Sequence, residues 1–117
     1  MSTPVGPYSP VVRAGDWIIT SGQLGLRDGA VVPGGIAAQT AQAIANIEGL
    51  LAAHGAGLGD VVKTLCFLHD LADFAAFNEA YVAAFGDHRP ARSTVGGVDL
   101  ALGTVVEIEA WAYKPQS

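Results

Sequence analysis

The sequence is poor in cysteine and in positive charge. Cys66 is the only cysteine, so no disulfide can form within the chain, and a reducing, cytoplasmic location is expected. Six lysines and arginines stand against eleven aspartates and glutamates, which gives a formal net charge of -5. The six positive residues are scattered singly, so the composition argues against a nucleic-acid partner.

Long apolar runs, metal-ligand spacings and cofactor motifs are missing as well. No window approaches 18 uninterrupted apolar residues, and residues 1–4 lack the start of a signal peptide, so no membrane partner is expected. The three histidines, at positions 54, 69 and 88, have no metal-binding spacing, and no phosphate-binding or dinucleotide-binding glycine motif occurs. We therefore expect neither a metal nor an organic cofactor. Neither Ser21 nor Cys66 has a recognisable base beside it, so any reaction must consist of holding an anion, placing a water and moving a proton.

With 117 residues, half of them hydrophobic, the chain is expected to form one domain over residues 1–117 with a sizeable core. The pattern predicts strands over 11–13, 17–24, 61–68, 90–95 and 105–111, and a small hairpin closed by Asp28-Gly29. It predicts helices over 36–54 and 71–85. The first helix should bury Ala37, Ala41, Ile44, Ile47 and Leu51, and the second should bury Phe74, Phe77, Tyr81 and Phe85.

This order of elements predicts an α+β fold with one mixed β-sheet and two helices packed on one face. The predicted strands are nevertheless apolar on both faces, since Trp17 and Ile19 alternate with Ile18, and Leu65 and Phe67 alternate with Cys66. A sheet that is apolar on both sides must be covered on both sides. Another layer or another copy of the chain is therefore expected.

The last two predicted strands carry the residues best suited to bind a ligand or to catalyse a reaction. Arg92 and Thr94 share one face of the first strand, and Glu107, Glu109 and Trp111 share one face of the second. On adjacent strands, Arg92 and Glu107 would both project from the side away from the core. Arginine suits a carboxylate ligand, and a glutamate can activate a water. A surface ion pair explains the spacing equally well.

Several motifs together resemble the RidA/YjgF family of reactive-intermediate deaminases over nearly the whole chain. They are Gly6-Pro7-Tyr8, Ile18 to Gln23, Asp60 to Thr64, Phe74 to Asn78 with Tyr81, Pro90 to Ser93, and Val106 to Ala110. The resemblance implies a chorismate-mutase-like fold that assembles as a homotrimer with its sites at subunit clefts.

The resemblance also implies the residue roles. Arg92 would bind the substrate carboxylate and Glu107 would activate water, while Tyr8, Ser21, Gly22, Asn78 and Thr94 would line the substrate site. Without it, Tyr8 would be a packing residue, Ser21-Gly22 a strand-end turn and Asn78 a helix-surface amide.

The implied activity is hydrolysis of enamines or 2-imino acids to 2-keto acids and ammonia. Thr94 stands where many members have cysteine, and Ala101 where proline is usual, so the preferred substrate can differ within this class. The alternative is a non-catalytic trimeric sensor that uses Arg92 to bind a small 2-keto acid or a related carboxylate. Endoribonuclease, a name often attached to the family, fits poorly with the acidic composition.

Overall fold

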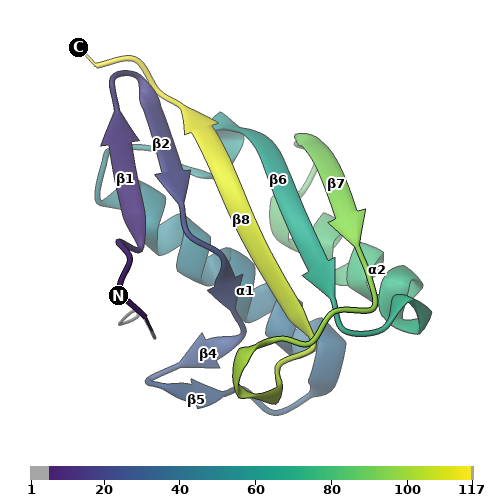
Figure 1. Ribbon diagram of the computed structural model, residues 1–117. Coiled ribbons are helices and arrows are strands. Elements are labelled where there is room, and N and C mark those ends of the chain that lie inside the picture. The colour runs from purple at the N-terminus through teal and green to yellow at the C-terminus, as the bar shows by residue number, and fades with distance from the viewer. Residues whose placement is uncertain (1–5, 117) are drawn as a thin grey trace.

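A mixed sheet forms one layer of the protein and two helices form the other. The computed structural model describes residues 6–116. The strands lie in the order β1-β2-β8-β6-β7, and β3 also pairs with β8 (Figure 1). β6 and β7 are parallel, whereas the other neighbours in this sheet are antiparallel. The strands are β1 (Val11–Ala14), β2 (Trp17–Thr20), β3 (Gln23–Leu24), β6 (Val61–Leu68), β7 (Ala91–Val95) and β8 (Val106–Tyr113).

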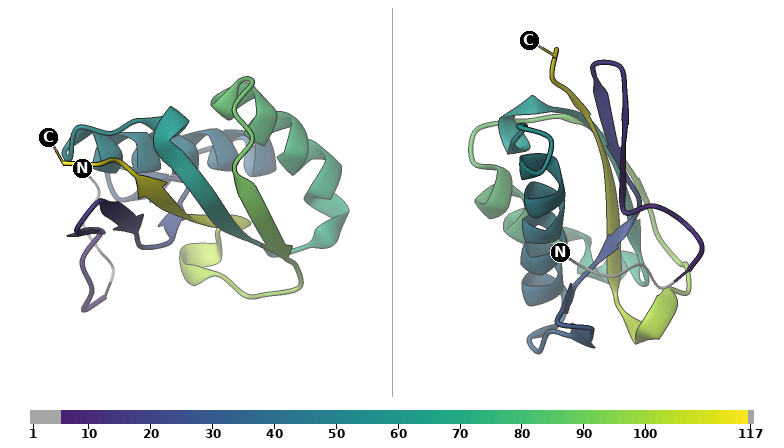
Figure 2. Two further views of the ribbon diagram at one scale, coloured as in Figure 1. Left: turned by 90° about the horizontal axis from the view of Figure 1, so that it is seen from above. Right: turned by 90° about the vertical axis from the view of Figure 1, so that its left-hand side faces the viewer.

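Both helices cover the same face of the sheet, which confirms the predicted α+β architecture (Figure 2). α1 (Gly35–Ala52) buries Ile44, Ile47 and Leu51 as expected. Ala37 and Ala41 are exposed, so the first half of the predicted stripe was wrong. The buried positions there are Gln39, Thr40 and Ala43, and Gln39 accepts a hydrogen bond from the Val105 backbone N–H at 2.9 Å. Among the described residues, no helix has the length and apolarity needed to cross a membrane.

α2 (Phe74–Phe85) starts later than the sequence suggests. Residues 71–73 form a 3-10 turn instead, whose start is capped by the Asp70 carboxylate accepting from the Ala72 N–H. Gly86, with φ of 68°, ends the helix at the predicted position. Phe77, Tyr81 and Phe85 are buried as predicted, but Phe74 remains 40% exposed.

Within residues 6–116, no layer covers the opposite face of the sheet (Figure 2). The alternation of the strands directs Ile19, Leu65, Phe67 and Trp111 to this side, where they are half-buried, and Trp17 is 39% exposed. We call this side the open face. An exposed face with this many apolar side chains is typical of an interaction surface.

A break interrupts the strand that the sequence predicts over 17–24. Ile19 pairs with Trp111 and Gln23 pairs with Ile108, so residues 20–22 lie opposite only Glu109 and Ala110. The extra residue is a β-bulge, and it separates β2 from β3. The side-chain oxygen of Thr20 holds the bulge to β8 by accepting from the Ala110 N–H at 3.1 Å.

A short hairpin follows the bulge and leads into α1. β4 (Leu26–Arg27) pairs with β5 (Ala30–Val31) around Asp28-Gly29, as predicted. Both turn residues have positive φ, 54° and 80°, as a two-residue hairpin turn requires.

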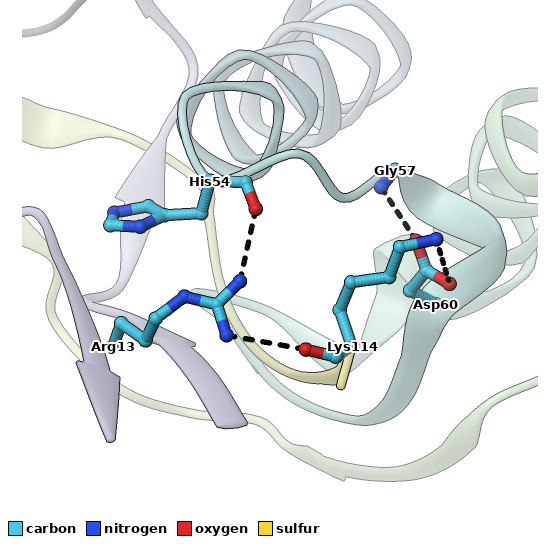
Figure 3. A network of polar contacts seen from close by, with 5 residues as sticks. All are labelled: Arg13, His54, Gly57, Asp60 and Lys114. Carbon is cyan, nitrogen blue, oxygen red and sulfur yellow. Dashed lines mark hydrogen bonds and ion pairs between the residues drawn. The ribbon is translucent and has the colours of Figure 1, made fainter. Parts of the chain in front are cut away.

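Arg13 ties three separate segments together at one end of the sheet (Figure 3). Its guanidinium donates to the carbonyl oxygens of Gly15, of His54 just after α1, and of Lys114 just after β8, at 3.0–3.2 Å. Asp60 accepts from the Gly57 N–H and lies 3.9 Å from Lys114 Nζ. This network fixes the first strand against the end of the helix and the last strand.

Candidate functional site

Glu107 lies on the open face, in the strand at the centre of the sheet. It pairs with Phe67 on β6 and with Leu24 on β3, so its carboxylate stands among apolar neighbours. Partial burial raises the pKa of Glu107 above its ordinary value. Burial, and then the charge of Glu107, raises the pKa of Glu109. A carboxylate with a raised pKa is a better proton acceptor near neutral pH than an ordinary surface glutamate.

The bulge places Gly22 directly against this carboxylate. A Cβ at position 22 would overlap Oε2 of Glu107 and lie 2.7 Å from its Cδ. Ser21, the preceding residue, donates through Oγ to the Ser9 carbonyl oxygen at 2.6 Å and through its N–H to that of Pro10 at 2.8 Å. Tyr8, which is 45% exposed, is on this same N-terminal segment. We call Ser21, Gly22 and Glu107 the Glu107 group, and Tyr8 lies on the segment to which Ser21 is hydrogen-bonded.

Gly22→Ala is expected to move the Glu107 carboxylate and to reduce any activity that depends on it by about 10-fold or more, since a displacement of about 1 Å can cost up to about 100-fold. The check is kcat/KM beside the thermal unfolding midpoint. Gly59→Ala is the matched control, because a Cβ there meets nothing within 4 Å. Equal losses in both variants would show that Gly22 has no particular relation to Glu107.

Arg92 lies on β7, the edge strand, and turns toward the helices. It is aligned with Thr64 in the parallel β6–β7 pair, and Thr64 is fully buried on the helix side. Its Cζ lies 5.6 Å from the ring centre of Phe74, 5.2 Å from that of Phe77 and 4.9 Å from that of Tyr81. These distances are those of cation–π contacts. We call Arg92 and these three rings the Arg92 group.

The expectation that Arg92 and Glu107 project together from adjacent strands was wrong. β6 lies between β7 and β8, and the two side chains lie on opposite faces of the sheet. The reason is topological: β7 returns parallel to β6 after the α2 crossover and takes the edge, while β8 enters between β2 and β6. Within one subunit, Arg92 and Glu107 therefore do not form an ion pair.

Thr94 and Asn78 lie on the two elements that form the Arg92 group. Thr94 shares the face of Arg92 and is aligned with Cys66. Asn78 follows Phe77 on α2, and its Oδ1 is buried without a hydrogen-bond partner. Cys66 is fully buried, and burial raises the pKa of its thiol to about 11. The predicted site residues thus divide between the Glu107 group and the neighbourhood of Arg92.

Sequence reasoning missed the contact between Arg92 and the aromatic rings. The helical spacing of Phe74, Phe77 and Tyr81 was interpreted as core packing, which is right for the last two. The sequence offered no signal for this contact, because the helix was predicted to begin at residue 71 and Phe74 was expected to be buried. Among the described residues, no three His, Cys, Asp or Glu side chains gather as a metal site would require.

The architecture is that of a small α+β protein in which helices cover one face of a mixed sheet. The model of a family described as Endoribonuclease L-PSP matches residues 1–114. The chain therefore belongs to this family, which is the RidA/YjgF family that its motifs resemble.

Relatives and solved structures agree with this assignment. A RutC family protein of Pyrococcus horikoshii is 42% identical over 95% of this chain and 90% of its own length. The 2-iminobutanoate/2-iminopropanoate deaminase of Escherichia coli is 41% identical over 94% and 89%. The crystal structure of the E. coli YjgF gene product has a TM-score of 0.88 at 41% identity, covering 94% of this chain and 90% of that one. E. coli TdcF with bound serine has a TM-score of 0.89 at 34% identity, covering 95% and 91%.

Proposed function

We propose that this protein is a deaminase that hydrolyses enamines and 2-imino acids to 2-keto acids and ammonia. The observation that carries the proposal is the state of Arg92. Its guanidinium is held by aromatic rings, and within residues 6–116 no hydrogen-bond acceptor or carboxylate of the chain engages it. Such an arginine is free to bind an external carboxylate with two parallel hydrogen bonds. Relatives named as imine deaminases, and serine bound to E. coli TdcF, support a small substrate with a carboxylate.

The working form is a homotrimer in which each site takes the Arg92 group from one subunit and the Glu107 group from its neighbour. Two features support this arrangement. Arg92 and Glu107 lie on opposite faces of one subunit, so a single subunit cannot present both to one small molecule. The open face that carries Glu107 is also apolar enough to require a cover.

The chemistry needs only groups of the chain and a water. Arg92 pairs with the carboxylate of the imino acid, and the Gly22 N–H assists. Glu107 takes a proton from water as the water oxygen attacks the imine carbon, and the electron pair of the C=N bond moves to nitrogen. The imine reacts in its protonated form, so the attack gives a neutral carbinolamine. Glu107 then returns its proton to the amino group, and the C–N bond breaks as the hydroxyl proton passes to Glu107, which releases ammonia and the 2-keto acid. Positioning and general base catalysis can supply the acceleration, because an imine is already prone to hydrolysis.

A coupled assay tests the activity. An amino-acid oxidase generates 2-iminopropanoate or 2-iminobutanoate in place, and semicarbazide traps the imine that remains. The wild-type protein should suppress semicarbazone formation in proportion to its concentration. No suppression with either imine would refute the proposal for these substrates.

Glu107→Gln distinguishes the deaminase from the carboxylate sensor. Turnover should fall about 100-fold or more, in the range typical of a lost general base, because glutamine cannot accept the proton. Affinity for 2-ketobutanoate, measured by calorimetry, should stay within about threefold of wild type, since Arg92 is untouched. A sensor would bind the keto acid and show no turnover even in the wild-type protein.

As the pH is lowered, the activity should be lost at a higher pH than it would be if the base were a glutamate with an ordinary pKa. Glu107 must be ionised to accept a proton, and its raised pKa moves the loss of the ionised form above pH of about 4.3. The measurement is kcat/KM against pH, with spontaneous hydrolysis subtracted and the oxidase in excess throughout. Glu109→Gln should keep this fall. A profile that stays flat down to pH of about 4 would remove Glu107 as the base.

A further inference from the structure

The three arginines with described contacts are held in two different ways. The N–H groups of Arg13 donate to three backbone carbonyl oxygens, and Nη1 of Arg89 donates to those of Gly86 and His88. Arg92 instead has three aromatic rings around its guanidinium and no such acceptor in the described chain. An arginine whose charge lies over aromatic rings uses no hydrogen bond in those contacts, so its N–H groups remain for other partners.

The rings that hold Arg92 are themselves fixed by the core. Tyr81 is 4% exposed, and its hydroxyl lies 2.7 Å from Oγ1 of Thr64. Thr64 is the residue aligned with Arg92 across the β6–β7 pair, so one hydrogen bond joins the ring to the strand beside the arginine. Phe77 is fully buried, and its ring centre lies 5.6 Å from that of Tyr81. These two rings form a platform with little freedom to move.

Phe74 completes the arrangement from outside. It is 40% exposed, lies in the first turn of α2, and is absent from the buried core. The burial of Phe74 therefore stabilises the fold less than the burial of Phe77 or Tyr81 does. Its contact with Arg92, at 5.6 Å, is the interaction that gives its ring a definite role.

We propose that Phe74 is a positioning residue, which with the Tyr81 and Phe77 platform holds the Arg92 guanidinium in place and leaves its N–H groups to the substrate carboxylate. This inference rests on the proposed function for the identity of the ligand, but the positioning itself is a property of the subunit. Restricting the side chain before binding reduces the conformational entropy lost on binding. Rings packed around the guanidinium also lower the local polarity, which strengthens a hydrogen bond from its N–H groups to a carboxylate.

Phe74→Leu and Phe74→Trp form a matched pair that tests the ring itself. Leucine keeps an apolar side chain but removes the π face, whereas tryptophan keeps one. Val82→Ala is the control, because Val82 is 43% exposed on the same helix. All variants are compared as the assembled protein with equal unfolding midpoints.

The first readout does not depend on activity. Protons on the Arg92 side chain, assigned in ¹H–¹⁵N and ¹³C spectra with Arg92→Lys as the reference, should be shifted upfield by the three rings. Phe74→Leu should reduce this shift, whereas Phe74→Trp and Val82→Ala should keep it. An unchanged shift in Phe74→Leu would overturn the positioning role, whether or not the protein hydrolyses imines.

The second readout is the division between KM and kcat with 2-iminobutanoate, together with the Kd for 2-ketobutanoate. Phe74→Leu should raise KM and Kd by about threefold to tenfold, the order of one cation–π contact, with kcat within about twofold of wild type. Phe74→Trp should restore both. Equal losses in the leucine and tryptophan variants would overturn the proposal. Absence of turnover in the wild type would refute the deaminase function, while the Arg92 shift and the Kd would still decide the positioning role.

Discussion

Arg92→Ala is expected to abolish imine hydrolysis while the subunit keeps its fold. The variant loses two charge-assisted hydrogen bonds to the substrate carboxylate, each contributing about 1.5–3 kcal/mol. The expected fall in kcat/KM is therefore about 10²-fold to 10⁴-fold, measured by semicarbazone formation at substrate concentrations well below KM.

The fold should tolerate this change because Arg92 lies on an edge strand and contributes packing and cation–π contacts rather than core volume. Arg27→Ala is the matched control, since Arg27 is exposed on the β4–β5 hairpin. Circular dichroism and the oligomeric state should match wild type for both variants. Turnover above about a tenth of the wild-type value in folded Arg92→Ala would contradict the assigned role.

Mixing two inactive variants is expected to restore activity. Arg92→Ala lacks the carboxylate-binding half of the site, and Glu107→Gln lacks the base. When the two variants are unfolded, combined in equal amounts and refolded together, their subunits should assemble at random into mixed trimers. A site that draws its arginine from one subunit and its glutamate from the next then has both intact in about a quarter of cases.

The recovered activity should be about a quarter of that of wild type refolded in the same way. Each variant refolded alone is the control and should remain inactive. A mixture that stays inactive, although mass spectrometry shows mixed trimers, would mean that both residues of a site come from one chain. That result would require the subunit to rearrange, because β6 separates the two strands.

Local pattern was sufficient for most of the fold. The period of the apolar residues located β6 at its observed limits, and Asp28-Gly29 and Gly86 marked a hairpin and a helix end through their positive φ. The break between β2 and β3 was not visible, because a bulge depends on how many residues the partner strand offers. The exposed Ala37 and Ala41 were missed because an alanine fits either face of a helix, so it does not indicate which face is buried. The larger Ile44, Ile47, Leu50 and Leu51 define that face.

The site was harder to predict because it depends on strand order. Alternation along each strand grouped Glu107 with Glu109, and Arg92 with Thr94, correctly. It contains no information about which strands are neighbours or which residues are aligned across them, and those two facts put Arg92 beside Thr64 on the helix side. The Gly22–Glu107 contact likewise follows from the bulge rather than from either motif alone.

The position of β7 also bears on how the protein avoids aggregation. As an edge strand it has one row of backbone N–H and C=O groups that pairs with no strand of the described chain, and other chains can add as strands to such a row. The strand has only five residues, Pro90 precedes it, and a charged side chain stands at its second position. These are features by which natural sheets discourage such pairing. Arg92, which is proposed to bind the substrate, thus also helps to prevent other chains from pairing with β7.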